Sequence, residues 1–178
     1  NASGLVVIAA SQLATTTALP AYTYSNGTAG VGATITATAN GALTVDGVAA
    51  TLGDRILVKN ETAGNAPYNG VYTVTDPGSA GLQFTLTRAT DNDQAADIPG
   101  AYTLVQGGAT QANTGWSQAT AAPIVIGTTA ISWSQFSSQT SYSAGNALVL
   151  NGTVFSVVPD GTTTAVNGSN QIAVKASA

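Results

Sequence analysis

Histidine, cysteine and methionine are absent from this chain of 178 residues, and only 7% of its residues are charged. Enzymes draw their general acids, bases and nucleophiles mainly from histidine, cysteine, lysine and the carboxylates, so the usual catalytic side chains are scarce here. Without cysteine the chain has neither disulfides nor thiolate metal ligands. We therefore expect no enzymatic activity and no cofactor, and a function that depends on shape and assembly.

Positive charge is also scarce. The chain has four Lys and Arg residues against eight Asp and Glu, a formal net charge of -4. We expect no nucleic-acid partner, because phosphate binding needs a basic stripe. We also expect no membrane insertion, because no run approaches the roughly 20 apolar residues of a spanning helix. Since position 1 is not Met, we expect a processed chain or a segment of a longer protein.

Turn-forming dipeptides are abundant. Between them lie short runs rich in Thr, Val, Ile, Leu and Tyr, which favour a half-buried pleated strand. Asn-Gly and Asp-Gly steps tolerate the positive φ angles of tight hairpin turns. Seven such steps begin at Asn26, Asn40, Asp46, Asn69, Asn151, Asp160 and Asn167. The sequence therefore predicts an all-β chain built of hairpins.

Two domains are expected along the chain. Residues 1–138 predict an antiparallel β-sandwich or barrel of roughly seven to ten strands, including a β-meander over residues 33–47. The polar stretch 137–143 predicts a linker, and residues 139–178 predict a short, stalk-like β-hairpin segment. Alternation of apolar and polar residues predicts eight buried side chains in the first domain. They are Ile56, Val58, Tyr72, Val74, Phe84, Leu86, Ile131 and Trp133.

The segment 139–178 carries a two-copy pattern and many apolar residues. An Asn-Gly step followed by Val recurs at a spacing of 16 residues, beginning at Asn151 and at Asn167. An isolated two-stranded hairpin is marginal in water, so these side chains need a partner surface, either the first domain or neighbouring chains. We expect oligomer contacts at Leu148, Leu150, Val154, Phe155, Ile172 and Val174.

An acidic cluster at Asp91, Asp93 and Asp97 is the candidate metal site, because calcium favours several carboxylate oxygens on one loop. The match to an EF-hand loop is partial, since alanines stand where a ligand and a glycine belong. The alternative, which we favour, is a solvated loop in which an acid pairs with Arg88. We therefore expect calcium to be dispensable.

Three tyrosines, Tyr22, Tyr24 and Tyr68, lie in predicted loops. Aromatic rings offer large apolar faces with polar edges, so these residues are candidate contacts for a glycan or a protein partner. Core packing is the alternative for them.

Charged residues also flank the apolar strand predicted at residues 55–59. Arg55 and Lys59 stand at its ends and Glu61 follows closely. The group is either a small charged site or, as we favour, a set of strand ends that keep the surface soluble.

Several phrases of the sequence match, in order and spacing, those of a known β-rich module. They are residues 14–22 (ATTTALPAY), 26–34 (NGTAGVGAT), 46–48 (DGV), 53–60 (GDRILVKN), 69–75 (NGVYTVT) and 86–91 (LTRATD). Together, over residues 12–136, they resemble a module of tail-fibre and other virion structural proteins of bacteriophages. Residues 142–157 (YSAGNALVLNGTVFSV) resemble the short units that follow this module in such fibres.

The resemblance implies a virion appendage, often trimeric, that supports host attachment from an extracellular particle. Its partners would be other copies of the chain in a homotrimer, other virion proteins, and a host surface glycan or protein. The trimer would form through equivalent 139–178 segments around a three-fold axis. Two other hypotheses stay open: a bacterial cell-surface or secreted adhesin module, and, less favoured, an enzyme that degrades surface polysaccharide.

Overall fold

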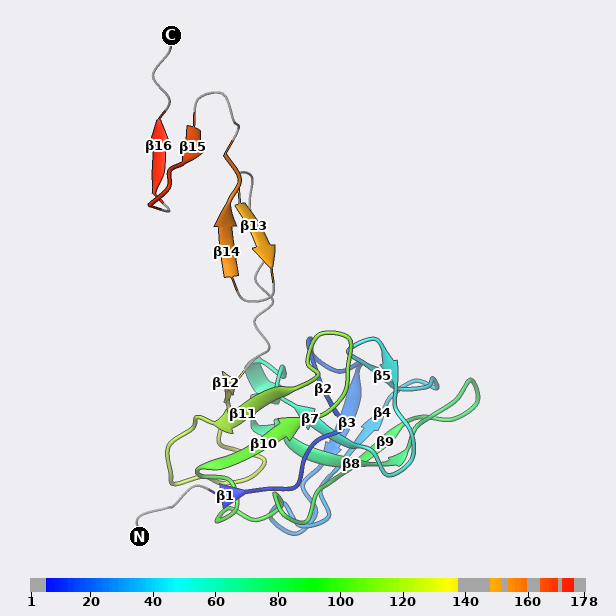
Figure 1. The fold of residues 1–178 in the computed structure, drawn as a ribbon. Helices are drawn as coiled ribbons and strands as arrows, with labels where there is room; N and C mark the ends of the chain where they lie inside the picture. Colours follow the sequence, from blue (N-terminus) through cyan, green and yellow to red (C-terminus); the bar gives the residue numbers. More distant parts are fainter. Residues whose placement is uncertain (1–5, 138–147, 152–153, 160–163, 170, 175–178) are drawn as a thin grey trace. The chain divides into compact units, whose positions relative to one another are not determined.

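The computed structural model of the chain describes residues 6–137, 148–151, 154–159, 164–169 and 171–174 (Figure 1). The chain divides into two units, residues 1–139 and residues 140–178. The described residues form strands apart from one short 3-10 helix, η1 (Ala63–Tyr68), and irregular connections, which confirms the all-β class. None of the described helical residues makes a helix long and apolar enough to cross a membrane.

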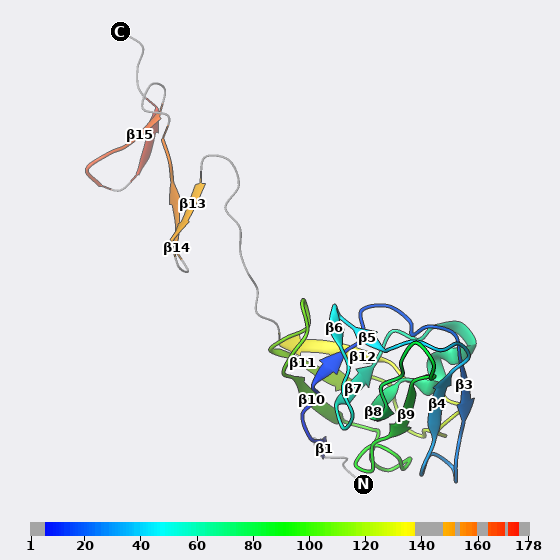
Figure 2. The same cartoon turned by 90° about the vertical axis from the view of Figure 1, so that its right-hand side faces the viewer.

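The larger sheet of the first unit has six strands in the order β2-β7-β8-β9-β4-β3. They are β2 (Leu13–Ala14), β7 (Arg55–Val58), β8 (Gly70–Asp76), β9 (Thr85–Arg88), β4 (Thr34–Ala37) and β3 (Tyr22–Ser25). Figure 2 shows β3 at the outer edge of this sheet beside β4. The strands are rich in Thr, Val, Ile and Tyr, whose branched or aromatic side chains pack well on a pleated surface.

A second sheet of four strands completes the framework of this unit, in the order β1-β10-β11-β12. Its strands are β1 (Val6–Val7), β10 (Ala101–Val105), β11 (Thr114–Gln118) and β12 (Trp133–Ser137). A separate hairpin joins β5 (Thr44–Val45) to β6 (Val48–Ala49) through Asp46 and Gly47, whose φ angles are 47° and 76°. Two positive φ angles define the tight hairpin turn that the Asp-Gly step predicts.

The six-stranded sheet separates two apolar cores, because successive side chains of a strand point to opposite faces. In β7, Leu57 enters the core shared with the four-stranded sheet, whereas Ile56 and Val58 enter the core covered by residues 43–50. All eight side chains predicted to be buried are buried, which confirms the alternation argument. Ile131 and Trp133 belong to the first core and the other six to the second.

Threonine occupies the part of the six-stranded sheet that faces away from the second core in β8, β9, β4 and β3. Its members are half-buried or exposed: Thr23, Thr34, Thr36, Thr73, Thr75, Thr85 and Thr87. Some of these hydroxyls bond one another or the backbone: Thr75 Oγ1 lies 3.1 Å from Thr87 Oγ1, and Thr23 Oγ1 donates to the carbonyl of Thr36 at 3.5 Å. A water-facing sheet surface is thus polar, as the alternation predicts.

The β-meander expected over residues 33–47 is wrong. β4 pairs with β3 and β9, and β5 pairs only with β6. Leu43 and Val45 instead lie against the face of the six-stranded sheet as part of the second core. Covering that face buries more apolar area than pairing at its edge would, so packing overrides the local hairpin pattern.

The pairing is also less uniform than an antiparallel fold implies. β1 pairs in parallel with β10, and β2 in parallel with β7. The described part of the first unit holds twelve strands rather than seven to ten. Four of them, β1, β2, β5 and β6, have only two residues each, too few for an alternation to show in the sequence.

The second unit contains two hairpins in its described residues. β13 (Leu148–Asn151) pairs with β14 (Val154–Val157), and β15 (Thr164–Val166) pairs with β16 (Ile172–Val174). In the second hairpin the Asn167 Oδ1 accepts the N–H groups of Ser169 and Gln171 at 3.0 and 2.9 Å. An asparagine that bonds the following backbone supports a turn.

Candidate functional site

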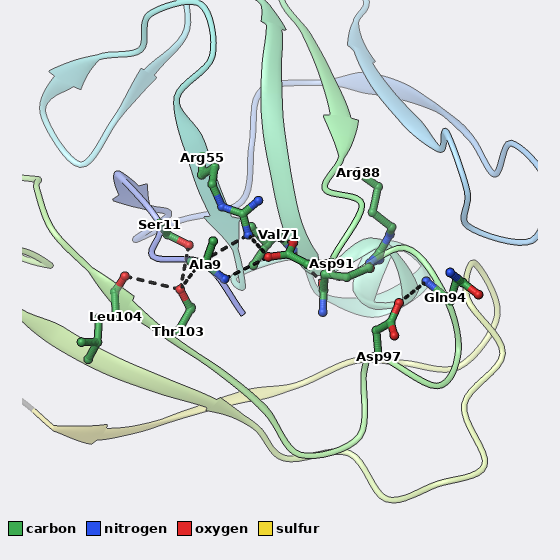
Figure 3. A network of polar contacts seen from close by, with 11 residues as sticks. Ala9, Ser11, Arg55, Val71, Arg88, Asp91, Gln94, Asp97, Thr103 and Leu104 are labelled. Carbon is green, nitrogen blue, oxygen red and sulfur yellow. Dashed lines mark hydrogen bonds and ion pairs between the residues drawn. The ribbon is translucent and has the colours of Figure 1, made fainter. Parts of the chain in front are cut away.

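Asp91, the first residue of the acidic cluster, joins three segments of the first unit (Figure 3). Its two carboxylate oxygens accept hydrogen bonds from Arg55 Nη2 at 2.8 and 2.9 Å, and its Oδ2 also accepts the N–H of Ala9 at 2.9 Å. The pairing expected with Arg88 is therefore wrong: Asp91 pairs with Arg55, and within the described residues Arg88 forms no salt bridge with an acid of the cluster. Asp91 fixes the N-terminal segment to β7.

The carboxyl groups of Asp93 and Asp97 have other surroundings than that of Asp91. Asp93 is buried, which raises the pKa of its carboxyl, and the nearby Asp97 raises this pKa further. The Asp97 Oδ2 accepts the N–H of Gln94 at 3.3 Å, and Figure 3 shows it turned toward Gln94. Within the described residues no three acidic, His or Cys side chains come together as metal ligands. The three carboxylates thus do not share one set of ligands.

Arg88 is a buried cation, although the sequence suggests it only as a partner for the acidic loop. Its side chain is 2% exposed, and it donates to the carbonyl oxygens of Asn69 at 2.8 Å and Asn92 at 3.2 Å. Its guanidinium carbon lies 5.1 Å from the centre of the Tyr72 ring. The signal was present in the sequence, because position 88 continues the alternation of the buried Phe84 and Leu86.

The charged residues around β7 also hold segments together, so the expectation of solvated strand ends is wrong. Glu61 is buried and accepts the N–H of Leu19 at 2.7 Å and the hydroxyl of Tyr22 at 2.9 Å. The Lys59 ammonium lies 4.0 Å from the centre of the Trp116 ring, a cation–π contact. Burial lowers the pKa of Lys59. These groups anchor loops to the sheets.

The three candidate tyrosines lie together. The rings of Tyr24 and Tyr68 stack with centres 3.9 Å apart, and Tyr22 meets Tyr68 edge-on at 6.3 Å. The Tyr24 hydroxyl donates to Asn26 Oδ1 at 2.8 Å, and the Tyr22 hydroxyl donates to Glu61. Burial, followed by the bond to Glu61, raises the pKa of Tyr22. All three side chains are half-buried, so the cluster is a rigid, partly accessible aromatic surface.

A cavity of about 320 Å³ lies beside Leu19, whose backbone N–H is bound by Glu61. It is lined by residues 15–20, including Leu19, and by residues 44–46. Asp46 at its edge accepts the N–H groups of Thr110 and Gln111 at 2.8 and 2.7 Å. Burial raises the pKa of this carboxyl, but the hydrogen bonds outweigh burial and leave the pKa below its usual value. The cavity lining therefore includes several threonines and Asp46, whose carboxylate is fixed by residues 110 and 111.

The expected oligomer contacts lie in the second unit. The side chains of Leu148, Ile172 and Val174 are 42%, 60% and 83% exposed. The side chains of the other expected contacts lie outside the described residues: Leu150, Val154 and Phe155. Four further valines of this unit are also exposed: Val149, Val157, Val158 and Val166. Apolar side chains thus dominate the described surface of these hairpins.

Comparison of the chain with protein-family models, with curated proteins and with solved structures finds no match.

Proposed function

We propose that this chain is a structural component of a bacteriophage virion appendage, a tail fibre or a related fibre, and that it supports host attachment as a homotrimer. The phrases between residues 14 and 91 and the unit at residues 142–157 support the proposal by their resemblance to such fibres. The all-β architecture is compatible with it.

The exposed apolar side chains of the second unit carry the proposal. An isolated hairpin cannot bury its own apolar residues, and exposed apolar patches of this kind mark interaction sites. Ile172 and Val174, on one strand, are more than half exposed. Equivalent segments of three chains around one axis would cover these side chains with their symmetry mates.

Attachment by a trimer needs no strong single site. Linked copies raise the effective concentration of each further contact, so weak contacts to a repetitive host surface add up to tight binding. The cluster of Tyr22, Tyr24 and Tyr68 is the surface that we assign to a host glycan or protein, because stacked rings offer apolar faces with hydroxyls at their edges.

The virion location is tested on purified phage particles from a producing host. Antibodies against residues 1–139, coupled to gold, should label a tail or another appendage in electron micrographs, and peptides of the chain should be found in the particles by mass spectrometry. Labelling of the bacterial surface with none on particles would instead support the adhesin hypothesis.

The assembly is tested by multi-angle light scattering. The full chain should have the mass of a trimer at micromolar concentration, and a version ending at Ser138 should have the mass of a monomer or associate far more weakly. A monomeric full chain, or a shortened chain that stays trimeric, contradicts the role assigned to residues 139–178.

A further inference from the structure

The outer face of the four-stranded sheet, which points away from the first core, carries four large apolar or aromatic side chains beside Ser117 and Ser134. In β10 the side chains of Ala101, Thr103 and Val105 are buried, whereas Leu104 is 53% exposed and Tyr102 is half-buried. Figure 3 shows the side chains of Thr103 and Leu104 directed to opposite sides of this strand. On the neighbouring strands Val7 is 69% and Phe136 is 55% exposed. We call Val7, Tyr102, Leu104 and Phe136 the outer face.

These four side chains form one continuous surface. Val7 stands opposite Tyr102, and Leu104 stands opposite Gly115. The Phe136 ring lies over Gly115, since a Cβ added there would be 2.6 Å from the ring. Tyr102 meets the same ring edge-on, with ring centres 6.0 Å apart. Glycine at position 115 thus lets Phe136 close the gap between β12 and β10.

The outer face continues into a shallow groove with a volume of about 310 Å³. Val7, Tyr102 and Leu104 line it together with residues 8–10 of the N-terminal segment. The backbone of Ala9, one of these lining residues, bonds the pair of Arg55 and Asp91. Aromatic and apolar side chains at the centre of a surface are typical of the core of a protein interface.

Exposure to water does not explain this composition. The water-facing part of the six-stranded sheet carries threonine, as described above, and so follows the polar-out pattern of a solvated sheet. The four-stranded sheet has Val7, Tyr102, Leu104 and Phe136 at outward positions, with serine at positions 117 and 134. The two surfaces belong to one unit. The difference between them indicates that the outer face of the four-stranded sheet is covered by a partner in the assembled protein.

We infer that the outer face packs against a second copy of the chain. This inference rests on the proposed trimer, because the trimer supplies the copy. Phe136 is close to the end of β12, and ten residues separate Ser137 from Leu148, where the exposed apolar hairpins begin. Ten residues span at most about 35 Å, so chains joined through their hairpins hold their outer faces at a high effective concentration.

Single-cysteine variants test the inference directly, because the chain has no cysteine of its own. Leu104→Cys places a thiol on the outer face, and Leu82→Cys places one in the connection between β8 and β9. The two native side chains are 53% and 51% exposed, which makes them a matched pair. Val7→Cys and Leu52→Cys, at 69% and 71%, form a second pair.

The measurement is the rate of labelling by a maleimide in the full chain, with oligomeric state followed by light scattering on the same samples. In the trimer, cysteine at position 104 should react about tenfold or more slowly than cysteine at position 82, because access requires local opening of the contact. Position 7 should be protected relative to position 52. On dilution to monomers the rates of each pair should converge.

Three results would overturn the inference, and they differ in what they leave standing. Equal labelling within each pair in a trimeric chain removes the outer-face contact but leaves the trimer. Protection of positions 104 and 7 in a monomeric chain shows that the chain covers this face with its own residues. Equal labelling in a chain that is monomeric removes both the contact and the proposed assembly.

Discussion

Arg88 shows how a charged residue is accommodated inside this protein. Its guanidinium is buried, donates to two backbone carbonyls, lies over the Tyr72 ring, and is close enough to Asp93 to offset part of the rise that burial causes in the pKa of that carboxyl. Transfer of a charge from water to the protein interior is costly, and hydrogen bonds to the charged group offset that cost. One side chain thus joins β9 to the segments at Asn69 and Asn92.

Phe84 provides a test of the second core at the level of one residue. The side chain is 3% exposed, so Phe84→Ala should lower the free energy of unfolding by about 3–5 kcal/mol. Denaturant unfolding followed by tryptophan fluorescence is a suitable measurement, because both tryptophans, Trp116 and Trp133, belong to the first unit. The control, Leu82→Ala, removes a half-exposed side chain and should cost less than about 1 kcal/mol. A similar small loss at Phe84 would place its ring at the surface.

Asp46 and Asp93 should affect the pH dependence of stability with opposite signs. The folded pKa of Asp46 is lowered, so its ionised form stabilises the protein above the unfolded pKa of about 3.9, and this contribution is lost as the pH falls through the folded pKa. The pKa of Asp93 is raised in the folded protein. Its ionisation therefore destabilises the protein once the pH rises above the pKa that Asp93 has in the unfolded chain.

The substitutions Asp46→Asn and Asp93→Asn should separate these two effects. Relative to the unsubstituted chain at pH 7, the first should lower the free energy of unfolding and the second should raise it. At a pH near 3, below the unfolded pKa, the gain from Asp93→Asn should vanish. Urea unfolding at a series of pH values measures both. A gain at Asp93 that persists at low pH would mean that charge is not its origin.

At the scale of elements, carboxylates hold irregular segments in place through hydrogen bonds. Asp91 holds the N-terminal segment, Glu61 holds the segment before β3, and Asp46 holds the connection between β10 and β11. Each uses oxygen lone pairs that a metal ion would otherwise occupy.

Calcium should therefore be dispensable for the acidic loop. Thermal melts of the full chain in millimolar calcium and in chelator should nearly coincide, because Asp91 is engaged by Arg55 and the three carboxylates do not share a ligand set. A reproducible rise in melting temperature on adding calcium, abolished by Asp93→Ala, would contradict this and restore Asp91, Asp93 and Asp97 as a metal site.

The start of β8 should tolerate no side chain. A Cβ at Gly70 would overlap the guanidinium of Arg88, so Gly70→Ala should cost about 1–3 kcal/mol through overpacking. Gly81 is the control, because a Cβ there meets nothing within 4 Å, and Gly81→Ala should change stability by less than about 0.5 kcal/mol. Equal effects at the two sites would show that Arg88 moves aside without cost.

At the scale of the whole molecule, the exposed apolar hairpins should control association. Replacing Ile172 and Val174 together by Ser removes apolar area from the second unit and should weaken trimer formation at least about tenfold, since each buried side chain contributes about 1.5–3 kcal/mol. Sedimentation equilibrium of the full chain measures the change. Leu52→Ser, an equally exposed position of the first unit, should leave association unchanged. Unaltered association of the double variant would exclude these residues from the contact.

The sequence predicts local features of this protein well. Period-two alternation identifies the buried set from Ile56 to Trp133, and the Asp-Gly step identifies the turn at Asp46, because both depend on neighbouring residues along the chain. The same alternation, extended by one step, identifies Arg88 as facing the core. The three tyrosines could be named as candidates, but their mutual stacking could not, since Tyr24 and Tyr68 are 44 residues apart.

Contacts between distant segments required the tertiary structure. Arg55 rather than Arg88 reaches Asp91, the hairpin around Asp46 covers a sheet face rather than extending a meander, and β1 and β2 enter their sheets in parallel. Each outcome depends on which segments bury the most apolar area and satisfy the most backbone groups together. The sequence alone thus determined the all-β class, the turns and the inward side of the longer strands. The tertiary structure decided strand partners, charge partners and which surfaces stay uncovered, because those depend on segments far apart in the chain.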